Sequence, residues 1–426
     1  MSESGSSTGA PQRESGWGRA TASLRNVQFR RVFIGNMAFF LAMGGQGIVR
    51  PWIAYQLTDQ AFALGITAAA MAIPMFFLSP IGGALADRVE RRRLIVLAQS
   101  IALVSELTVF ALLVSDNLEF WHLVAAAASL GCCFPLVMPA RSAIVANLVE
   151  RKHLGAAMGL NMTGVNVTRV VGPAAAGYLI SVIGVEGAYL VNVSLYAAAI
   201  AAMLTVNKLP PLGGNLPKLT THMIEGFQYL RKDRLVGILL LFGLVPQFLA
   251  MPFQNILPAF TERVWEVGPA GFGMLNAAVG VGAVFGSVYV AGRSQEKRRL
   301  PMMMAAVMAF GVLLAAFAMS PYFWPALVLA FLANIGASVF STLNNVSIQL
   351  VIPDEVRGRV SSYMMMSVSL PLLGALPIGW IADQAGPPAA VAGASLLAVV
   401  MAVGFYASSA LLRGLDDRVR SELRRS

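Results

Sequence analysis

Three ionisable side chains stand inside long apolar runs of the sequence. Arg50, Glu106 and Arg169 each have apolar residues on both sides. At the centre of a lipid-embedded helix such a charge costs about 3 kcal/mol, and residues that persist there usually pair with one another or act on a ligand or a proton. These three residues are therefore the first candidates for chemistry.

Each of the three has more than one interpretation. Glu106 is either a proton site, because removal from water favours the neutral form of a carboxyl group, or the fixed partner of an arginine. Arg50 either lines a cavity or reaches water as a snorkelling side chain. Arg169 is the strongest candidate because it lies near the middle of its run. We expect it to bind an anionic group of a substrate or to hold its helix to a neighbour.

The remaining reactive residue types do not combine into a catalytic or metal-binding set. Cys132 and Cys133 are adjacent in an apolar run, so we interpret them as packing residues. His122, His153 and His222 are scattered along the chain. The sequence has no Ser-His-Asp, HExxH or paired-acid pattern, and we expect neither an enzyme, a bound metal nor a cofactor.

The composition indicates which elements position these residues. Hydrophobic residues make up 57% and charged residues 12% of the chain, against roughly 25% charged in an average soluble domain. This is too little charge to cover a soluble surface, so we expect the chain to lie in a lipid bilayer. The net charge of +10 does not indicate nucleic-acid binding, because the basic residues form short clusters between apolar runs.

A run of about 20 mainly apolar residues is needed to cross a bilayer, and the sequence contains twelve such runs. The predicted fold class is an all-α membrane protein with twelve transmembrane helices in two pseudo-symmetric six-helix bundles. The predicted spans are Val32–Leu57, Phe62–Ala86, Leu94–Val114, Trp121–Val145, Ala156–Ile183, Gly187–Val206, Leu235–Ala259, Ala270–Ala291, Pro301–Met319, Tyr322–Leu350, Val360–Ala382 and Ala389–Leu412.

The basic residues orient these spans. Counting the two terminal tails, every second segment outside the spans is basic, and these seven segments together hold 27 of the 31 lysines and arginines. The alternate loops hold one basic residue, Arg263, beside seven acidic residues. Because lysine and arginine accumulate on the cytoplasmic side, we predict a multi-pass protein of the inner (cytoplasmic) membrane with both termini in the cytoplasm.

The chain also divides into two similar halves. The predicted divisions are a disordered cytoplasmic tail (1–31), an N-terminal bundle (32–206), a cytoplasmic linker (207–234), a C-terminal bundle (235–412) and a basic cytoplasmic tail (413–426). At an offset of about 203 residues, Gly83 before one basic loop aligns with Gly286 before another, and residues 149–155 align with 352–358. Parallel halves of this kind are typical of transporters, whose substrate site lies between them.

Small residues are concentrated in the second, fifth, eighth and eleventh spans. Small side chains let helix backbones approach closely in lipid. We predict that these spans pack across the contact between the halves and slide there. The interface candidates are Gly172, Pro173, Gly177, Gly282, Gly286, Gly374 and Gly379.

The segment Gly83–Arg93 resembles the loop signature of the major facilitator superfamily: Gly, three residues, Asp-Arg, one residue, Gly, then basic residues. The chain has Glu90 in place of the second glycine of that pattern. The resemblance implies a conformational latch in which Asp87 and Arg88 exchange partners, together with Gly83 and Arg91. Alternatively, the arginine run only sets topology and touches anionic lipid.

Three further stretches resemble particular branches. Pro139-Ala140-Arg141 with Asn161, and the segment Pro353–Ser362, are similar to the branch that contains the enterobactin exporter and drug exporters. Arg169–Pro173 with Gly177 resembles an antiporter motif. The resemblance implies a monomer that exports a small, partly apolar compound and uses the proton gradient as its energy source.

The same resemblance implies that the seventh and tenth spans line a central cavity. Neutral amides stand in both spans, and together with the many methionines they suit an apolar or mixed substrate. The amide candidates are Gln254, Asn255, Asn344 and Asn345.

Other function classes stay open as alternatives. The main rival is a major facilitator importer of a small metabolite, which the direction of transport would distinguish. An integral membrane enzyme would need converging catalytic residues, and a sensor or scaffold would need a soluble signalling domain. A channel would need an open pore, which alternating halves do not provide.

Overall fold

The computed structural model describes residues 24–149, 154–207, 228, 231–293, 298–353, 360, 363–364 and 366–423, and within that part of the chain every regular element is helical. The first half is made of five helices. They are α2 (Val27–Thr58), α3 (Ala61–Arg88), α4 (Arg91–Val114), α5 (Phe120–Leu148) and α6 (Leu154–Leu204). The predicted tail 1–31 therefore includes the first turn of α2, which Asn26 caps by accepting from Gln28 N at 2.9 Å.

Helix α6 is two helices joined at Gly184. A straight helix of its 51 residues would be about 76 Å long, more than twice the roughly 30 Å of a bilayer core. Gly184 has φ of 77°, a left-handed conformation that glycine adopts without strain. Contacts with α2 show that the chain reverses there: the first segment runs parallel to α2 and the second antiparallel. The facing pairs are Asn36–Asn161 and Gly44–Gly172 for the first segment, and Gly35–Ala199 and Gly45–Asn192 for the second.

The second half repeats this plan. Its helices are α8 (Arg234–Leu249), α9 (Phe253–Arg263), α10 (Gly268–Ala291), α11 (Arg299–Ala318), α12 (Phe323–Val351), α14 (Leu370–Ala385) and α15 (Pro387–Ser408). The bounds of α5 and α12 differ by 203 residues at both ends, the offset between the predicted halves. The seventh predicted span is broken between α8 and α9, where Pro252 precedes Phe253.

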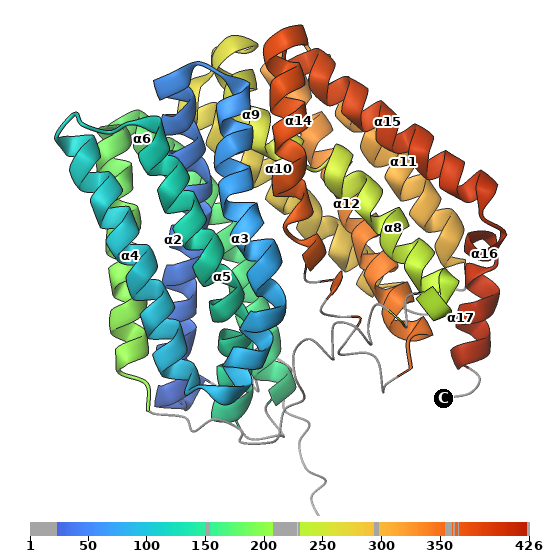
Figure 1. The fold of residues 1–426 in the computed structure, drawn as a ribbon, viewed down its shortest axis with the longest axis horizontal. Helices are drawn as coiled ribbons and strands as arrows, with labels where there is room; N and C mark the ends of the chain where they lie inside the picture. Colours follow the sequence, from blue (N-terminus) through green and yellow to red (C-terminus); the bar gives the residue numbers. More distant parts are fainter. Residues whose placement is uncertain are drawn as a thin grey trace, which may run out of the picture.

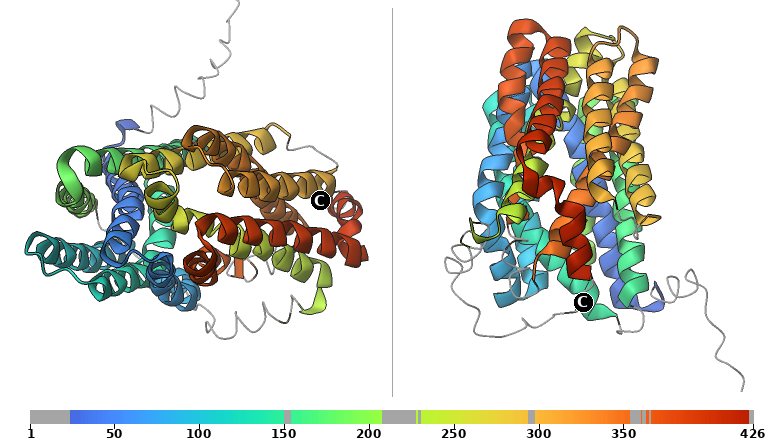
Figure 2. Two further views of the ribbon diagram at one scale, coloured as in Figure 1. Left: turned by 90° about the horizontal axis from the view of Figure 1, so that it is seen from above. Right: turned by 90° about the vertical axis from the view of Figure 1, so that its right-hand side faces the viewer.

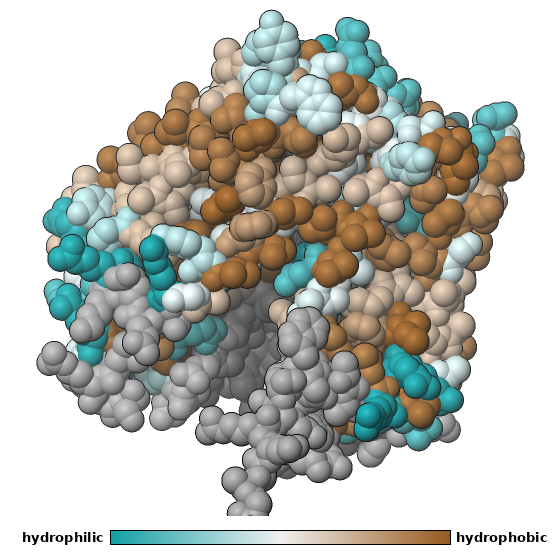
Figure 3. Space-filling model, turned by 180° about the vertical axis from the view of Figure 1, so that it is seen from behind, coloured by the Kyte–Doolittle hydropathy of each residue, from teal (hydrophilic) through white to brown (hydrophobic). Residues whose placement is uncertain are grey.

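Ten helices of the described chain are long and apolar enough to cross a membrane. One of them is α6, which holds two predicted spans, and α14, with 16 residues, covers another. The helices are thus consistent with twelve spans. Apolar side chains cover much of the outside: Phe77, Leu97 and Val288 are each more than 60% exposed. Figure 3 shows apolar residues as a broad brown band across the face in view.

The two halves lie side by side and meet at one end (Figures 1 and 2). The closest contacts between them are α3 with α14 and α6 with α10. We call the end that carries Asp59, Arg263 and Asp383 the closed end, and the opposite end, where α3 meets α4, the open end. At the open end the ribbons of the halves diverge, and the space-filling view is hollowed between them.

The end of the chain folds onto the second half. Short helix α16 (Ala410–Arg413) leads to α17 (Leu415–Leu423), whose Leu415 and Val419 are buried against α11 and α12. The Asp416 carboxylate accepts from the backbone N–H of Arg299 at 2.9 Å. The predicted basic tail 413–426 therefore contains a packed helix.

Candidate functional site

Glu106 lies at the centre of a buried polar network between α2, α4 and the second segment of α6. We call this set the Glu106 network: Gln46, Arg50, Glu106, Tyr189 and Asn192. Glu106 and Arg50 are 1% and 5% exposed and form an ion pair. Gln46 Nε2 donates to Glu106 at 2.6 Å, and the Tyr189 hydroxyl donates to the same carboxylate.

Helical spacing aligns the members of this network. Gln46 and Arg50 are four residues apart on α2, and Tyr189 and Asn192 are three apart on α6, so each pair shares one helix face. Asn192 Nδ2 closes the network by donating to Gln46 Oε1 at 3.3 Å. The carboxylate therefore accepts three hydrogen bonds, one of them from a guanidinium group.

The geometry distinguishes between the alternatives for Arg50 and Glu106. Arg50 does not snorkel to water, because it is buried against Glu106. Glu106 has an arginine as partner in this conformation. A buried pair of this kind is strongly coupled, since removing one member leaves the other charge uncompensated.

A second buried cluster lies closer to the open end in the same half. We call it the Arg141 cluster: Asn36, Phe39, Arg141, Asn161 and Tyr196. Arg141 of α5 is 3% exposed and donates to Asn36 Oδ1. Asn36 Nδ2 in turn donates to Asn161 at 2.9 Å. The guanidinium carbon lies 4.1 Å from the centre of the Phe39 ring, a cation–π contact.

The sequence reasoning did not select Arg141 as a charged candidate. The signal was present, because Arg141 falls inside the predicted span Trp121–Val145, as a fourth arginine or acid within an apolar run. Arg141 was identified only as part of the motif Pro139-Ala140-Arg141, which resembles that of a transporter branch.

Arg169 lies apart from both clusters. Its side chain is exposed, on the face of α6 that meets α10, and its backbone oxygen is 3.3 Å from an ideal Cβ built on Gly280. The structure therefore does not bring Arg169 together with Arg50 and Glu106. Its place beside the contact between the halves fits both roles predicted for it.

The amide candidates of the second half differ in exposure. Asn344 of α12 is 5% exposed, lies against Gly243 of α8, and its Oδ1 has no hydrogen-bond partner among the described residues. Asn345 is exposed. Gln254 and Asn255 are half-buried near the start of α9, where Gln254 contacts the Met251 sulfur at 3.7 Å.

Only some of the predicted interface residues lie where the halves meet. An ideal Cβ on Gly177 lies 2.8 Å from Gly273 Cα of α10, and one on Gly379 lies 2.6 Å from Ala61 O of α3. The Pro173 oxygen also approaches Gly273, at 2.8 Å from its ideal Cβ. At these positions a larger side chain would collide with the backbone of the other half.

The other four interface predictions were wrong, because these glycines face helices of their own half. Gly172 packs on α2, Gly282 and Gly286 pack on α12, and Gly374 packs on α8. Membership of a span did not indicate which face of the helix carries each glycine.

Polar contacts join the halves at the closed end, and sequence reasoning missed them. Arg263 of α9 pairs with Asp59 at 2.9 Å, and Gln56 donates to Glu262 at 3.1 Å. The Asp383 carboxylate of α14 accepts from the N–H groups of Ala61 and Phe62 at 2.7 and 2.9 Å. It therefore caps α3 from the opposite half. These acidic residues had served only to orient the predicted loops.

The latch candidates lie where α3 ends and α4 begins. Gly83, Asp87 and Arg88 belong to the last turns of α3, but their side chains lie outside the described part of the structure. Arg91 is buried at the start of α4. Glu90 has φ of −55°, so the position where the superfamily pattern has glycine needs no left-handed conformation here.

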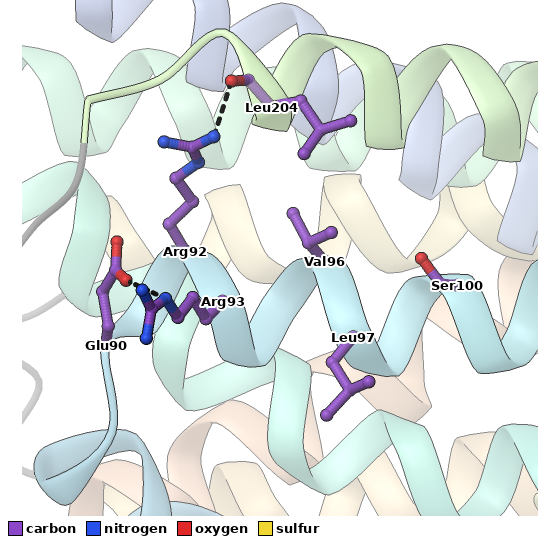
Figure 4. Close-up of a pocket in the computed structure, with 7 residues that line it drawn as sticks. All are labelled: Glu90, Arg92, Arg93, Val96, Leu97, Ser100 and Leu204. Atoms are coloured by element: carbon purple, nitrogen blue, oxygen red, sulfur yellow. Dashed lines mark hydrogen bonds and ion pairs between the residues drawn. The ribbon is translucent and has the colours of Figure 1, made fainter.

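A shallow pocket of about 290 Å³ lies beside this loop (Figure 4). Glu90 pairs there with Arg93 at 2.8 Å, and Arg92 donates to the Leu204 carbonyl at the end of α6 at 2.8 Å. Figure 4 shows the apolar side chains of Val96 and Leu97 along the same groove. Within its own half, Arg92 thus binds the end of the neighbouring helix α6, whereas Arg93 pairs with the residue that precedes its own helix.

Two parallel helical bundles that meet at one end, with buried charge inside one of them, define a transporter of the major facilitator fold and not an enzyme. The chain belongs to the transmembrane secretion effector family of this superfamily, which it matches over residues 18–421.

Sequence and structural relatives agree with this assignment. The chain is 25% identical over 383 residues to the enterobactin exporter EntS of Shigella boydii serotype 18, covering 88% of this chain and 90% of that protein. The enterobactin exporter of Escherichia coli O1:K1 matches to the same extent. The crystal structure of the nucleoside transporter NupG superimposes with a TM-score of 0.74 at 13% identity, over 89% of this chain and 98% of that one.

A bacterial homologue of the human lysosomal transporter Spinster, solved in an inward-facing and unoccupied conformation, has a TM-score of 0.69 at 16% identity. The superposition covers 93% of this chain and 98% of the homologue. At these identities both solved structures bear on the fold alone.

Proposed function

We propose that the chain is a secondary active exporter of a small, partly apolar compound, a drug-like molecule or a siderophore, that exchanges it for protons by alternating access. The direction is supported by the enterobactin exporters, which align with 88% of the chain. The protein is proposed to act as a monomer in the inner membrane, with both termini and the open end in the cytoplasm.

The ion pair of Glu106 and Arg50 is the observation that carries proton coupling. Both groups lie on membrane-crossing helices and are almost fully buried, and Glu106 accepts hydrogen bonds from Gln46 and Tyr189. A carboxylate held this way can take up one proton and release one arginine. That single event changes the charge distribution between α2 and α4, which is the kind of local switch that biases a two-state transporter.

Alternating access follows from where the halves touch. In this conformation the closed-end contacts of Asp59 and Asp383 hold the outer side shut. Opening that side requires α3 to leave Asp383 and α9 to leave Asp59, while the glycine contacts between α6 and α10 allow the helices to slide. The exposed Arg169 and the amides Gln254, Asn255 and Asn345 are proposed to meet the substrate between the halves.

The experiment is transport into everted membrane vesicles that contain the protein, with a fluorescent lipophilic dye panel and an imposed proton gradient. Uptake that a protonophore abolishes is expected, together with loss of uptake in Glu106→Gln. Glu186→Gln is the matched control, because that glutamate is exposed and lies outside the network. Dye movement in the opposite direction would establish the importer instead, and gradient-independent uptake would overturn proton coupling.

A further inference from the structure

Arg141 is a buried positive charge for which the described part of the chain offers no carboxylate. Its side chain is 3% exposed, and its one hydrogen bond goes to the neutral amide of Asn36. Arginine keeps its proton in proteins, so the charge cannot be removed by titration. A charge with only a ring and an amide as partners is costly in an apolar surrounding, and such a position usually serves a ligand.

The unused atoms of Arg141 form a defined binding edge. Among the described residues, Nε and Nη2 both lack an acceptor, whereas Nη1 donates to Asn36. Nε and Nη2 together are one side of the guanidinium fork, which matches the two oxygens of a carboxylate. The Tyr196 hydroxyl, buried in the same cluster, is also without a partner. Its ring stacks edge-on against Phe39 at 5.9 Å.

The ring contact holds the guanidinium plane in place. Phe39 lies 4.1 Å from the guanidinium carbon and is itself 2% exposed. A fork that is fixed by one ring and one amide loses little freedom when an anion binds, so the site is preorganised.

The cluster is within reach of the open end. Arg141 lies seven residues before the end of α5 at Leu148, or about 10 Å along the helix. Asn161, at the edge of the cluster, is 9% exposed. Phe40, whose ring centre is 5.9 Å from the guanidinium carbon, is half-buried.

The matching position of the second half carries no charge. At the 203-residue offset, Arg141 of α5 corresponds to Asn344 of α12, which is buried and neutral. Since the two helices have matching bounds, the arginine is not required to build a helix of this kind. The charge therefore distinguishes the N-terminal half.

We propose that Arg141, with Asn36 and Tyr196, is a binding site for an anionic oxygen group, and that this group is a carboxylate of the exported compound. The occupant's identity rests on the proposed function, whereas the anion site itself does not. A small inorganic anion shares the same chemistry, and the experiment distinguishes the two sources.

The test is the thermal unfolding of the purified protein titrated with sodium benzoate, with chloride or phosphate, and with the neutral analogue benzamide. Benzoate is expected to raise the unfolding temperature with saturation, as ligands of the native state do, and benzamide is not. Arg141→Asn, which copies Asn344, is expected to weaken benzoate binding by about 10-fold or more, the loss of a hydrogen bond between charged groups. Arg293→Asn is the matched control, because Arg293 also stacks on a ring, at 4.3 Å from Tyr289, but is exposed.

Each outcome tests either the anion site or the identity of its occupant. Stabilisation by chloride or phosphate that depends on Arg141, without any additional effect of benzoate, would overturn the substrate assignment and keep the anion site. Equal benzoate binding by wild type and Arg141→Asn would overturn the site. If Arg141→Asn does not fold, Arg141→Lys replaces it: it keeps the charge but lacks the fork, so benzoate binding weakens while chloride binding stays.

A transport measurement separates this inference from the proposed function. In everted vesicles, Arg141→Asn is expected to lose uptake of an aromatic acid and to keep uptake of its methyl ester. Equal loss of both would indicate a structural role only. Benzoate binding without any transport by wild type would leave the site standing and refute export.

Discussion

Replacing only one member of the pair of Arg50 and Glu106 is expected to destabilise the protein strongly. The size of the loss depends on which member is replaced. Glu106→Gln keeps an acceptor for Gln46 and Tyr189 but leaves a buried arginine without a counter-charge, which costs about 3–5 kcal/mol. Arg50→Met leaves a carboxyl group that can take up a proton and become neutral. It should therefore cost less than Glu106→Gln, because arginine has no such escape.

The double variant makes the test specific. With Arg50→Met and Glu106→Gln combined, no charge remains in the Glu106 network. The double variant is expected to be more stable than Glu106→Gln alone, which gives a coupling energy of the order of 2–3 kcal/mol. The assay is reversible unfolding of the purified protein in mild detergent, followed for all four members of the cycle under one set of conditions.

Two results would refute this reasoning. The first is a Glu106→Gln variant within about 1 kcal/mol of the wild type, the range of an exposed ion pair. The second is additivity of the two substitutions, which would mean that the groups do not interact. The exposed Glu186→Gln again serves as the control for replacing a glutamate by its amide.

Three further perturbations address the contact between the halves and the docked end of the chain. Asp383→Ala removes the cap of α3 at Ala61 and Phe62. It should weaken closure by about 1 kcal/mol and increase labelling of a cysteine placed at Ala61. Unchanged labelling would contradict the capping role. Gly177→Leu adds a side chain at a position where an ideal Cβ would lie only 2.6 Å from Pro269 O. The larger residue should prevent closure of the outer side, so spin labels on α6 and α10 should move apart. Label distances equal to those of the wild type would show that the contact adapts. Asp416→Ala removes the acceptor for the Arg299 N–H. It should release α17 from the second half, so protease cleavage after Arg413 should increase while transport persists. Unchanged cleavage would show that the packing of Leu415 and Val419 is enough to hold the helix.

The general plan of the molecule could be predicted from the sequence. Hydropathy and the alternating basic loops indicated the helices, because crossing a bilayer is a requirement on each segment by itself. Boundaries were less accurate where local geometry intervenes. The break between α8 and α9 lies at Pro252, just before the first residue of α9. The helix α17 forms because its apolar face is buried against α11 and α12.

The candidate site was predicted only in part. Arg50 and Glu106 were found one by one, as charges in apolar runs, but their pairing was left open. Arg141 was overlooked as a charge although it met the same criterion. The closed-end residues Asp59 and Asp383 were interpreted as loop residues, because no pattern in the sequence indicates which loop of the other half they face.

The sequence by itself determined that this is an all-helical membrane protein of two related halves, since hydrophobicity, charge asymmetry and the repeat are properties of short segments. Only the tertiary structure decided which side chains meet. Arg50 and Glu106 are 56 positions apart, and Asn36 and Arg141 are 105 apart. Their contacts depend on the rotation of each helix about its axis, which close packing of the whole bundle fixes. The same packing turned four of the predicted interface glycines toward their own half and left an arginine without a counter-charge.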